Sequence, residues 1–256
     1  MAELGTYSFV LTVAEGKRLI AKAVAALPVV QKAMKEGIVA VCKGSTNAYV
    51  AEELLGESLS KGSYVLGRGV PATRDTAAVF TGNIPEVIFV KGERSALTLA
   101  EAVAKMQRGD VVIKGANALN YESGIAGLLV GHPEGGTIGV VIGSCFGKGL
   151  HLVIPVGLEK EIAEDIQGLA DLISAEPEIS RTGMPSLWPI TGEIVTELEA
   201  LELLAGVEAH QIGAGGLCGA EGGSWFGVWG TEEELAVARE LVAAVQGEPG
   251  FGEACG

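Results

Sequence analysis

The sequence predicts an α/β protein with a mostly parallel, Rossmann-like sheet, helices on both faces and a small C-terminal α+β lobe. In the first 185 residues the apolar stretches are continuous, as in strands buried on both faces, and helical patterns separate them. After residue 185, the order of helix, strand, glycine-rich turn, strand and helix is typical of an antiparallel α+β unit. We therefore expect an α/β domain over residues 1–185 and a ferredoxin-like lobe, packed on it, over residues 186–256.

Capping residues mark the first predicted helices. Thr12 and Glu15 form a capping-box pattern ahead of apolar residues at helical spacing. Pro28 ends that helix and can start a second one. A strand over residues 38–42 follows, and then a helix that closes at Gly56.

Later segments continue the alternation of strands and helices. Thr98 and Glu101 form a second capping-box pattern, which predicts another helix. Short apolar stretches predict strands over residues 64–66, 87–90, 110–114 and 150–156. In the C-terminal lobe we expect helices over residues 193–204 and 232–245, and strands over residues 207–212 and 224–229.

Composition narrows the class of protein. A net charge of −14 and a pI of about 4.7 argue against a nucleic-acid or anionic-membrane partner, since both require a basic face. No apolar stretch approaches the ~20 residues of a spanning helix, and the N-terminus lacks the basic region of a signal peptide. Four cysteines without C-x-x-C spacing are typical of reduced thiols, and the three histidines lack metal-ligand spacing. We expect a cytoplasmic protein that binds no metal.

The strand over residues 38–42 leads directly into a helix, and the join has the composition of an anion-binding loop. Lys43 carries a charge, Gly44 allows close approach of the backbone, and Ser45 and Thr46 add hydroxyl donors. The first N–H groups of a helix have no internal partner and attract negative charge, so this loop, with Asn47, predicts a phosphate or similar anion site. The alternative is a glycine turn in which Ser45 is an ordinary N-cap.

Two further joins have a similar composition. Lys114, Gly115 and Asn117 follow the strand over residues 110–114, at the same end of a parallel sheet as the first loop. Their alternative is a turn in which Asn117 makes an Asx-type hydrogen bond. A third loop, of Gly135, Gly136 and Thr137, could form a second anion site, or a glycine connection with Thr137 as N-cap.

Together these joins resemble the A-type ribose-5-phosphate isomerases and, more broadly, the superfamily that also holds glucosamine-6-phosphate deaminases and family I CoA transferases. Val39–Thr46 is similar to the first loop of that family, Ile113–Ala118 to its second motif and Gly135–Ile138 to its glycine-rich third loop. Trp188–Ile190 and Gly222–Phe226 resemble parts of its small lobe. The resemblance spans most of the chain and implies an isomerase-like fold that binds phosphate.

The isomerase reaction is not implied, because the catalytic positions differ. Lys114 and Asn117 replace the two aspartates of the second motif. His132 and Pro133 stand near the place of the family's lysine, and Val141 at about the place of its glutamate. Aldose–ketose isomerisation needs an acid and a base, and these residues do not supply them. We therefore expect an anionic small-molecule ligand, with Asn117 contacting its hydroxyl or carbonyl group, and leave open whether a reaction is catalysed.

Two alternatives belong to other classes. The segment Glu122–Gly127 resembles the Glu-Asn-Gly signature of family I CoA transferases, which would make Glu122 a carboxylate nucleophile and CoA the cofactor. A solvated loop carboxylate is the simpler interpretation of Glu122. The other alternative is a non-catalytic assembly protein whose small lobe mediates oligomerisation. In either case we expect a homo-oligomer, and Trp188, Trp225 and Trp229 are candidate aromatic anchors of a subunit or lobe interface.

Overall fold

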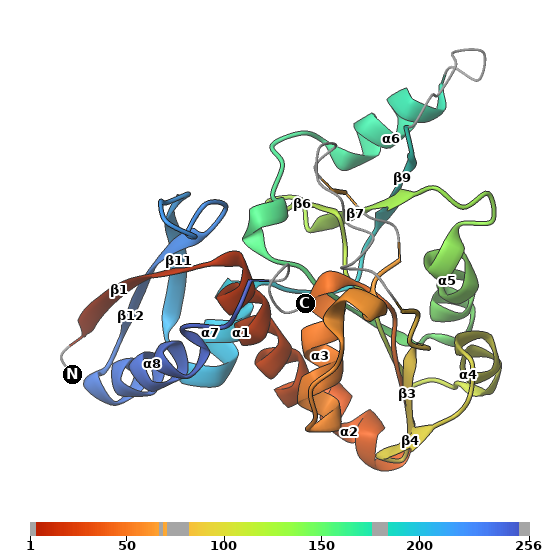
Figure 1. The fold of residues 1–256 in the computed structure, drawn as a ribbon, viewed down its shortest axis with the longest axis horizontal. Coiled ribbons are helices and arrows are strands. Elements are labelled where there is room, and N and C mark those ends of the chain that lie inside the picture. Colours follow the sequence, from red (N-terminus) through yellow and green to blue (C-terminus); the bar gives the residue numbers. More distant parts are fainter. Residues whose placement is uncertain (1–3, 67–68, 71–81, 176–183, 251–256) are drawn as a thin grey trace.

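A six-stranded sheet forms the centre of the protein (Figure 1). The computed structural model describes residues 4–66, 69–70, 82–175 and 184–250. In sheet order the strands are β10 (Glu193–Val195), β8 (His151–Pro155), β5 (Val111–Ile113), β2 (Ile38–Val41), β3 (Val87–Val90) and β4 (Glu93–Ser95). The first four are parallel, β3 pairs antiparallel with β2, and β4 pairs antiparallel with β3. The expected α/β class with a mostly parallel sheet is confirmed.

Helices cover this sheet and leave its central strands buried. The described part of the chain contains eight α-helices. Five of them precede β8 in the sequence: α1 (Val13–Ala26), α2 (Pro28–Glu36), α3 (Ser45–Leu55), α4 (Leu99–Lys105) and α5 (Gly136–Lys148). In Figure 1, α2 and α3 lie on one side of β3, and α4 and α5 lie on the other. Every residue of β5 is buried, which explains why its apolar stretch is continuous.

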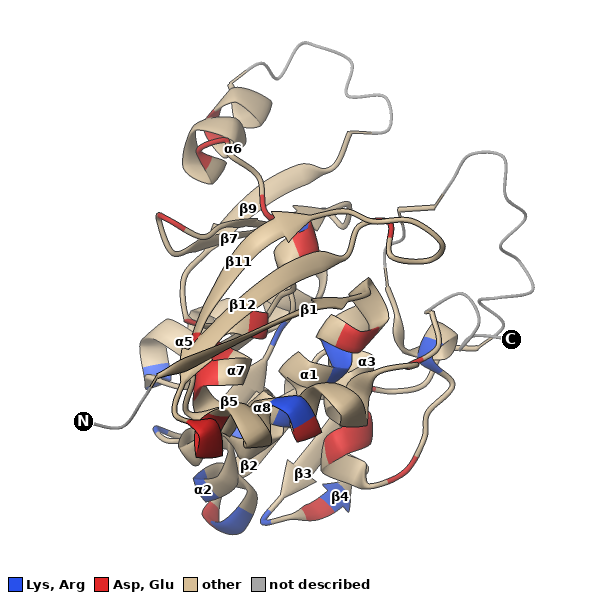
Figure 2. Ribbon diagram, turned by 90° about the vertical axis from the view of Figure 1, so that its left-hand side faces the viewer, with Lys and Arg blue, Asp and Glu red and all other residues tan. Residues whose placement is uncertain are grey.

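A second sheet joins the two ends of the described chain. Strand β1 (Gly5–Leu11) pairs antiparallel with β12 (Ser224–Gly230), which pairs with β11 (Glu208–Ala214); Figure 2 shows the three strands side by side. Helices α7 (Glu197–Ala205) and α8 (Glu232–Val245) pack against this sheet. Phe226 and Val228 are buried, whereas Trp225 and Trp229 are 45% and 38% exposed. The two tryptophans therefore lie on an open face of the sheet.

A third, smaller sheet lies beside α6 (Ile166–Ser174). It consists of β6 (Ala118–Asn120), β7 (Ile125–Val130) and β9 (Ser186–Ile190), all antiparallel. Strands β9 and β10 follow residue 185, yet they pair with β7 and β8, which precede it. Hydrogen bonds of two sheets thus connect the segments on either side of that residue.

Most predicted elements are present. Both predicted capping boxes form, at Thr12 and Thr98, and α3 ends at Gly56 in the left-handed conformation. The strands predicted over residues 87–90, 110–114 and 150–156, those of the C-terminal lobe, and the helix over 232–245 are confirmed to within a few residues.

Two predicted elements are wrong. Residues 61–64 form a 3-10 helix, whereas a strand was predicted over residues 64–66. The buried side chain of Tyr64 bridges two strands of the central sheet instead of belonging to a strand itself. Its hydroxyl donates to the carbonyl of Val41 (2.6 Å) and accepts from the N–H of Val87 (2.9 Å), joining β2 and β3. The helix predicted over residues 193–204 begins only at Glu197, since Thr196 caps it and residues 193–195 form β10.

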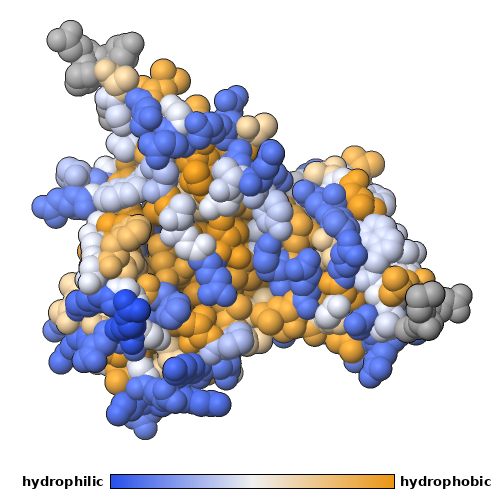
Figure 3. All heavy atoms as spheres, turned by 180° about the vertical axis from the view of Figure 1, so that it is seen from behind, coloured by the Kyte–Doolittle hydropathy of each residue, from blue (hydrophilic) through white to orange (hydrophobic). Residues whose placement is uncertain are grey.

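The outer surface mixes polar and apolar residues. On the face seen in Figure 3, hydrophobic residues (orange) lie between hydrophilic ones (blue). The most exposed large hydrophobic side chains include Leu217, Phe146 and Leu172, at 82%, 75% and 68%. None of the described helices is both long enough and apolar enough to cross a membrane.

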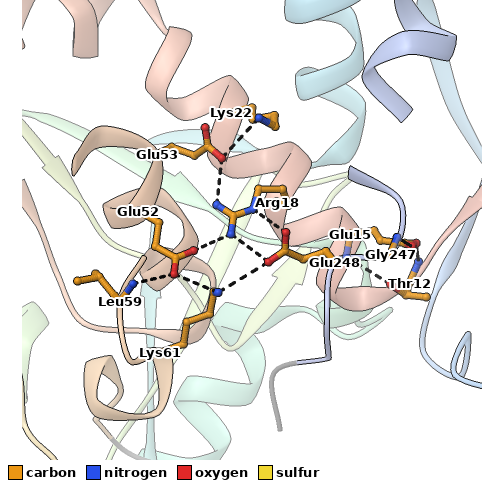
Figure 4. A network of polar contacts seen from close by, with 10 residues as sticks. All are labelled: Thr12, Glu15, Arg18, Lys22, Glu52, Glu53, Leu59, Lys61, Gly247 and Glu248. Atoms are coloured by element: carbon orange, nitrogen blue, oxygen red, sulfur yellow. Dashed lines mark hydrogen bonds and ion pairs between the residues drawn. The ribbon is translucent and has the colours of Figure 1, made fainter. Parts of the chain in front are cut away.

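An ionic network fixes α3 to α1 and to the segment after α8 (Figure 4). The guanidinium of Arg18 in α1 contacts Glu52 (2.6 Å), Glu53 (3.0 Å) and Glu248 (2.9 Å). Lys61 contacts Glu52 (3.1 Å) and Glu248 (3.7 Å). The Arg18, Glu52 and Lys61 side chains are only 6–14% exposed, so this network is partly desolvated and holds the helix that carries the predicted anion loop.

Candidate anion-binding pocket

Three lysines meet at one edge of the central sheet. Lys43 follows β2, Lys114 follows β5, and Lys160 ends the 3-10 helix Leu158–Lys160 that follows β8. These three strands are neighbours and parallel, so their carboxyl ends share one edge, where ligands of such sheets bind. All three lysines line a cavity of about 250 Å³, and no described residue of its lining is acidic. In a chain of net charge −14, this is a locally basic pocket.

The N-terminus of α3 opens into this pocket. Gly44 is the N-cap and Ser45 the first helical residue, so the alternative in which Ser45 caps the helix is wrong. No described side chain caps α3, which leaves its first N–H groups available to a ligand. Gly44 has an extended backbone, and a Cβ built there would come no closer than 3.8 Å to another described residue. Space above the helix end is therefore open.

Asn47 joins the two strand ends beneath the pocket. Its side-chain amide donates to the carbonyls of Cys42 (2.7 Å) and Ile113 (3.1 Å), at the ends of β2 and β5. Its Oδ1 is buried and has no hydrogen-bond partner among the described residues. An unmade hydrogen bond of this kind costs about 1–3 kcal/mol, so Oδ1 is an acceptor that a donor group in the pocket would satisfy.

The lysine ammonium groups are poorly solvated. Lys160 donates to the carbonyl of Ala116 (2.9 Å) and, more distantly, to Oγ1 of Thr46 (3.5 Å). Burial lowers the pKa of Lys160 to about 8, against the opposing effect of nearby Glu159. Lys114 Nζ donates to the carbonyl of Gly115 (3.1 Å), and burial lowers its pKa as well. Bound anionic groups would compensate this desolvation.

A second chamber adjoins the pocket. It has a volume of about 470 Å³ and shares Lys43, Lys114, Asn117 and Leu66 with the first. Its remaining lining is largely apolar or glycine and comprises Leu128, Leu129, Val130, Gly131, His132, Gly135, Gly136, Thr137 and Ile138. The first, second and third predicted loops therefore lie around two neighbouring chambers that share part of their lining.

Both remaining alternatives for these loops are wrong in detail. The Asn117 side-chain oxygen accepts the N–H of Leu129 in β7 (3.0 Å), across the sheet rather than within an Asx turn. Gly135, not Thr137, is the N-cap of α5, and its φ of +82° favours glycine. A Cβ at Gly135 would also lie 2.7 Å from the ring of Trp188.

Other candidate residues lie outside the first pocket. Glu122 is exposed in the turn between β6 and β7, where the Ser123 N–H bonds to the side chain of Asn120 (2.9 Å). It lines neither chamber. His132 lines the second chamber, and its Nδ1 accepts the N–H of Glu134 (3.2 Å).

Sequence reasoning missed Lys160, although a signal was present. The strand over residues 150–156 is followed within a few residues by a glycine and a lysine, as the first two strands are by Lys43-Gly44 and Lys114-Gly115. Behind Lys160 lie two carboxylates, Glu159 and Glu197. Burial and the charge of Glu159 raise the pKa of Glu197 to about 7, although it accepts the N–H of Leu158 (3.0 Å).

Two cysteines, Cys42 and Cys145, lie buried among the described residues, while a third, Cys218, is exposed. Burial raises the pKa of Cys42 to about 12 and that of Cys145 to about 11, so both thiols are uncharged at neutral pH. No group of three or more His, Cys, Asp and Glu side chains within the described ranges is arranged to hold a metal ion.

In comparisons with known proteins, no family model, curated protein or solved structure matches this chain.

Proposed function

We propose that the pocket binds a phosphorylated or similarly anionic small metabolite. The observation that carries the proposal is the meeting of Lys43, Lys114 and Lys160, from three neighbouring strand ends, around a cavity whose described lining contains no carboxylate. The uncapped N-terminus of α3 adds N–H donors to the same cavity. The unpaired Oδ1 of Asn47 adds an acceptor suited to a hydroxyl group of the ligand.

We also propose that the chain is related to the ribose-5-phosphate isomerase superfamily and shares its Rossmann-like sheet and ferredoxin-like lobe. This relationship is supported by the arrangement of the three loops, since Ser45, Asn117 and Thr137 line two neighbouring chambers. The pocket lacks carboxylates where that family has its acid and base, so we propose shared ligand chemistry rather than a shared reaction. The exposed position of Glu122, outside both chambers, gives no support to acyl transfer.

The test is a thermal-shift titration with inorganic phosphate and a panel of sugar phosphates. A ligand that binds only the folded state raises the melting temperature, by the equivalent of about 2.7 kcal/mol at a concentration one hundred times its Kd. Sodium chloride at matched ionic strength is the control for general screening.

Two variants locate the site. Gly44→Ala places a methyl group over the start of α3 without meeting another described residue closely, so the fold should be kept while phosphate affinity falls at least tenfold. Lys32→Gln removes an exposed positive charge from α2 and should leave affinity unchanged. If no phosphorylated compound shifts the melting temperature, or Gly44→Ala binds as the wild type does, the proposal is wrong.

A further inference from the structure

Lys114 has fewer compensating neighbours than the other two lysines of the pocket. Lys43 donates to the side chain of Asn83, and Lys160 has the carboxylates of Glu159 and Glu197 nearby. Lys114 makes no ion pair within the described ranges, and its only hydrogen bond there goes to the carbonyl of the next residue.

The electrostatic surroundings of Lys114 favour the neutral amine. Burial lowers its pKa, and the one group that would raise it is the thiolate of Cys42. That thiolate is absent at neutral pH, because burial raises the pKa of Cys42 to about 12. A neutral lysine amine is a nucleophile, and desolvation beside another cationic group is one way in which proteins activate it. Here burial supplies the desolvation, and Lys160 lines the same cavity.

We propose that Lys114 is a nucleophilic amine that captures the carbonyl group of an anionic ligand as an imine. The proposal rests on the proposed function, because the α3 N-terminus and Lys43 would hold the anionic group while Lys114 reacts. The proposal also narrows the ligand class to a small aldehyde or ketone that bears a phosphate or carboxylate group.

The position of Lys114 between the chambers fits such a ligand. Lys114 lines both chambers, as Lys43 does, so a ligand anchored at the start of α3 and extending toward the second chamber would lie beside it. That chamber is apolar at Leu128, Val130 and Ile138, which suits an uncharged remainder of the ligand.

The step balances without an oxidant or a metal. The Nζ lone pair attacks the carbonyl carbon, the carbonyl oxygen takes up a proton, and the nitrogen loses one. The resulting carbinolamine accepts a second proton at its hydroxyl group, releases water and leaves a protonated imine. Lys160, whose pKa is about 8, is mostly protonated at pH 7 and is the proton donor that the pocket offers.

Borohydride trapping tests the assignment. The protein is incubated at pH 7 with pyridoxal 5′-phosphate, an aldehyde that carries a phosphate, reduced with borohydride, and digested for mass spectrometry. We expect Lys114 to be labelled several times faster than the exposed Lys32 and Lys91, because burial lowers the pKa of Lys114 and so leaves more of its amine neutral. Inorganic phosphate should slow this labelling, and pyridoxal, which lacks the phosphate, should label Lys114 more slowly.

The variant Lys114→Arg keeps a positive charge but forms no imine, so it should lose the label while still melting cooperatively and binding phosphate. Labelling of Lys114 no faster than of Lys32, or preferential labelling of Lys160, overturns the assignment even if inorganic phosphate raises the melting temperature. Fast labelling of Lys114 that phosphate does not slow and that pyridoxal matches supports the reactive amine but overturns the proposed anion site.

Discussion

Removal of the charge of Glu52 should destabilise the protein through the ionic network of α3. The Glu52 carboxylate, 6% exposed, receives Arg18 at 2.6 Å, Lys61 at 3.1 Å and the N–H of Leu59 at 2.9 Å. Loss of one partner of a buried ion pair costs about 3–5 kcal/mol. Arg18 keeps Glu53 and Lys61 keeps Glu248, so we expect Glu52→Gln to cost somewhat less, about 2–3 kcal/mol.

Thermal and urea unfolding measure this cost. For a chain of this length, 2–3 kcal/mol corresponds to a fall in melting temperature of roughly 4–12 °C. Glu57→Gln is the matched control: it breaks the pair of Glu57 with Arg94, which is 3.3 Å long with both side chains about half exposed, and should cost less than about 0.5 kcal/mol. A Glu52→Gln variant no less stable than Glu57→Gln would refute the view that this network holds α3 in place.

Three further perturbations follow from the structure. Tyr64→Phe leaves a carbonyl of β2 and an N–H of β3 unpaired and should lower the free energy of unfolding by about 1–3 kcal/mol in urea titrations, with the fold retained. The pKa of Glu197 is about 7 in the folded state against 4.5 for a free glutamate, so between these pH values the folded state holds a proton that the unfolded state has lost. The contribution of this group to stability should therefore fall as pH rises from 4.5 to 7. Urea midpoints of Glu197→Gln should lose this part of the pH dependence. Gly135→Ala combines a strained φ with a clash against Trp188 and should destabilise by at least about 1 kcal/mol, whereas Gly131→Ala, where nothing lies within 4 Å of the added Cβ among described residues, should have little effect in the same melts.

Local signals predicted the elements that depend on neighbouring residues. The capping boxes, the Gly56 helix end and the continuous apolar strands all follow from interactions within a few positions along the chain. The positions of Lys43 and Lys114 at one sheet edge followed from the rule for parallel strands. Their sharing of one cavity agrees with that expectation.

Elements that depend on distant partners were not predicted. Tyr64 resembles a strand residue locally, but its hydroxyl serves as a cross-link between β2 and β3. The segment Glu122–Gly127 was likened to a CoA-transferase signature or interpreted as a solvated loop, whereas residues 118–130 form a hairpin that β9 completes after more than fifty intervening residues. Lys160 was missed because its place in the pocket depends on the 3-10 helix after β8, for which the sequence offers only Gly157 as a turn signal.

The pairing of β1 with β12 has a consequence for synthesis of the protein. Gly5 pairs with Gly230, so β1 leaves the ribosome more than two hundred residues before its partner strand. At roughly 5–20 residues per second, that delay is on the order of ten seconds or more. During this time Phe9 and Leu11, buried in the finished sheet, have no sheet to pack into. Strands β2, β5 and β8 of the central sheet are all made before β12, so we expect them to pair before the antiparallel sheet with its non-local contacts closes.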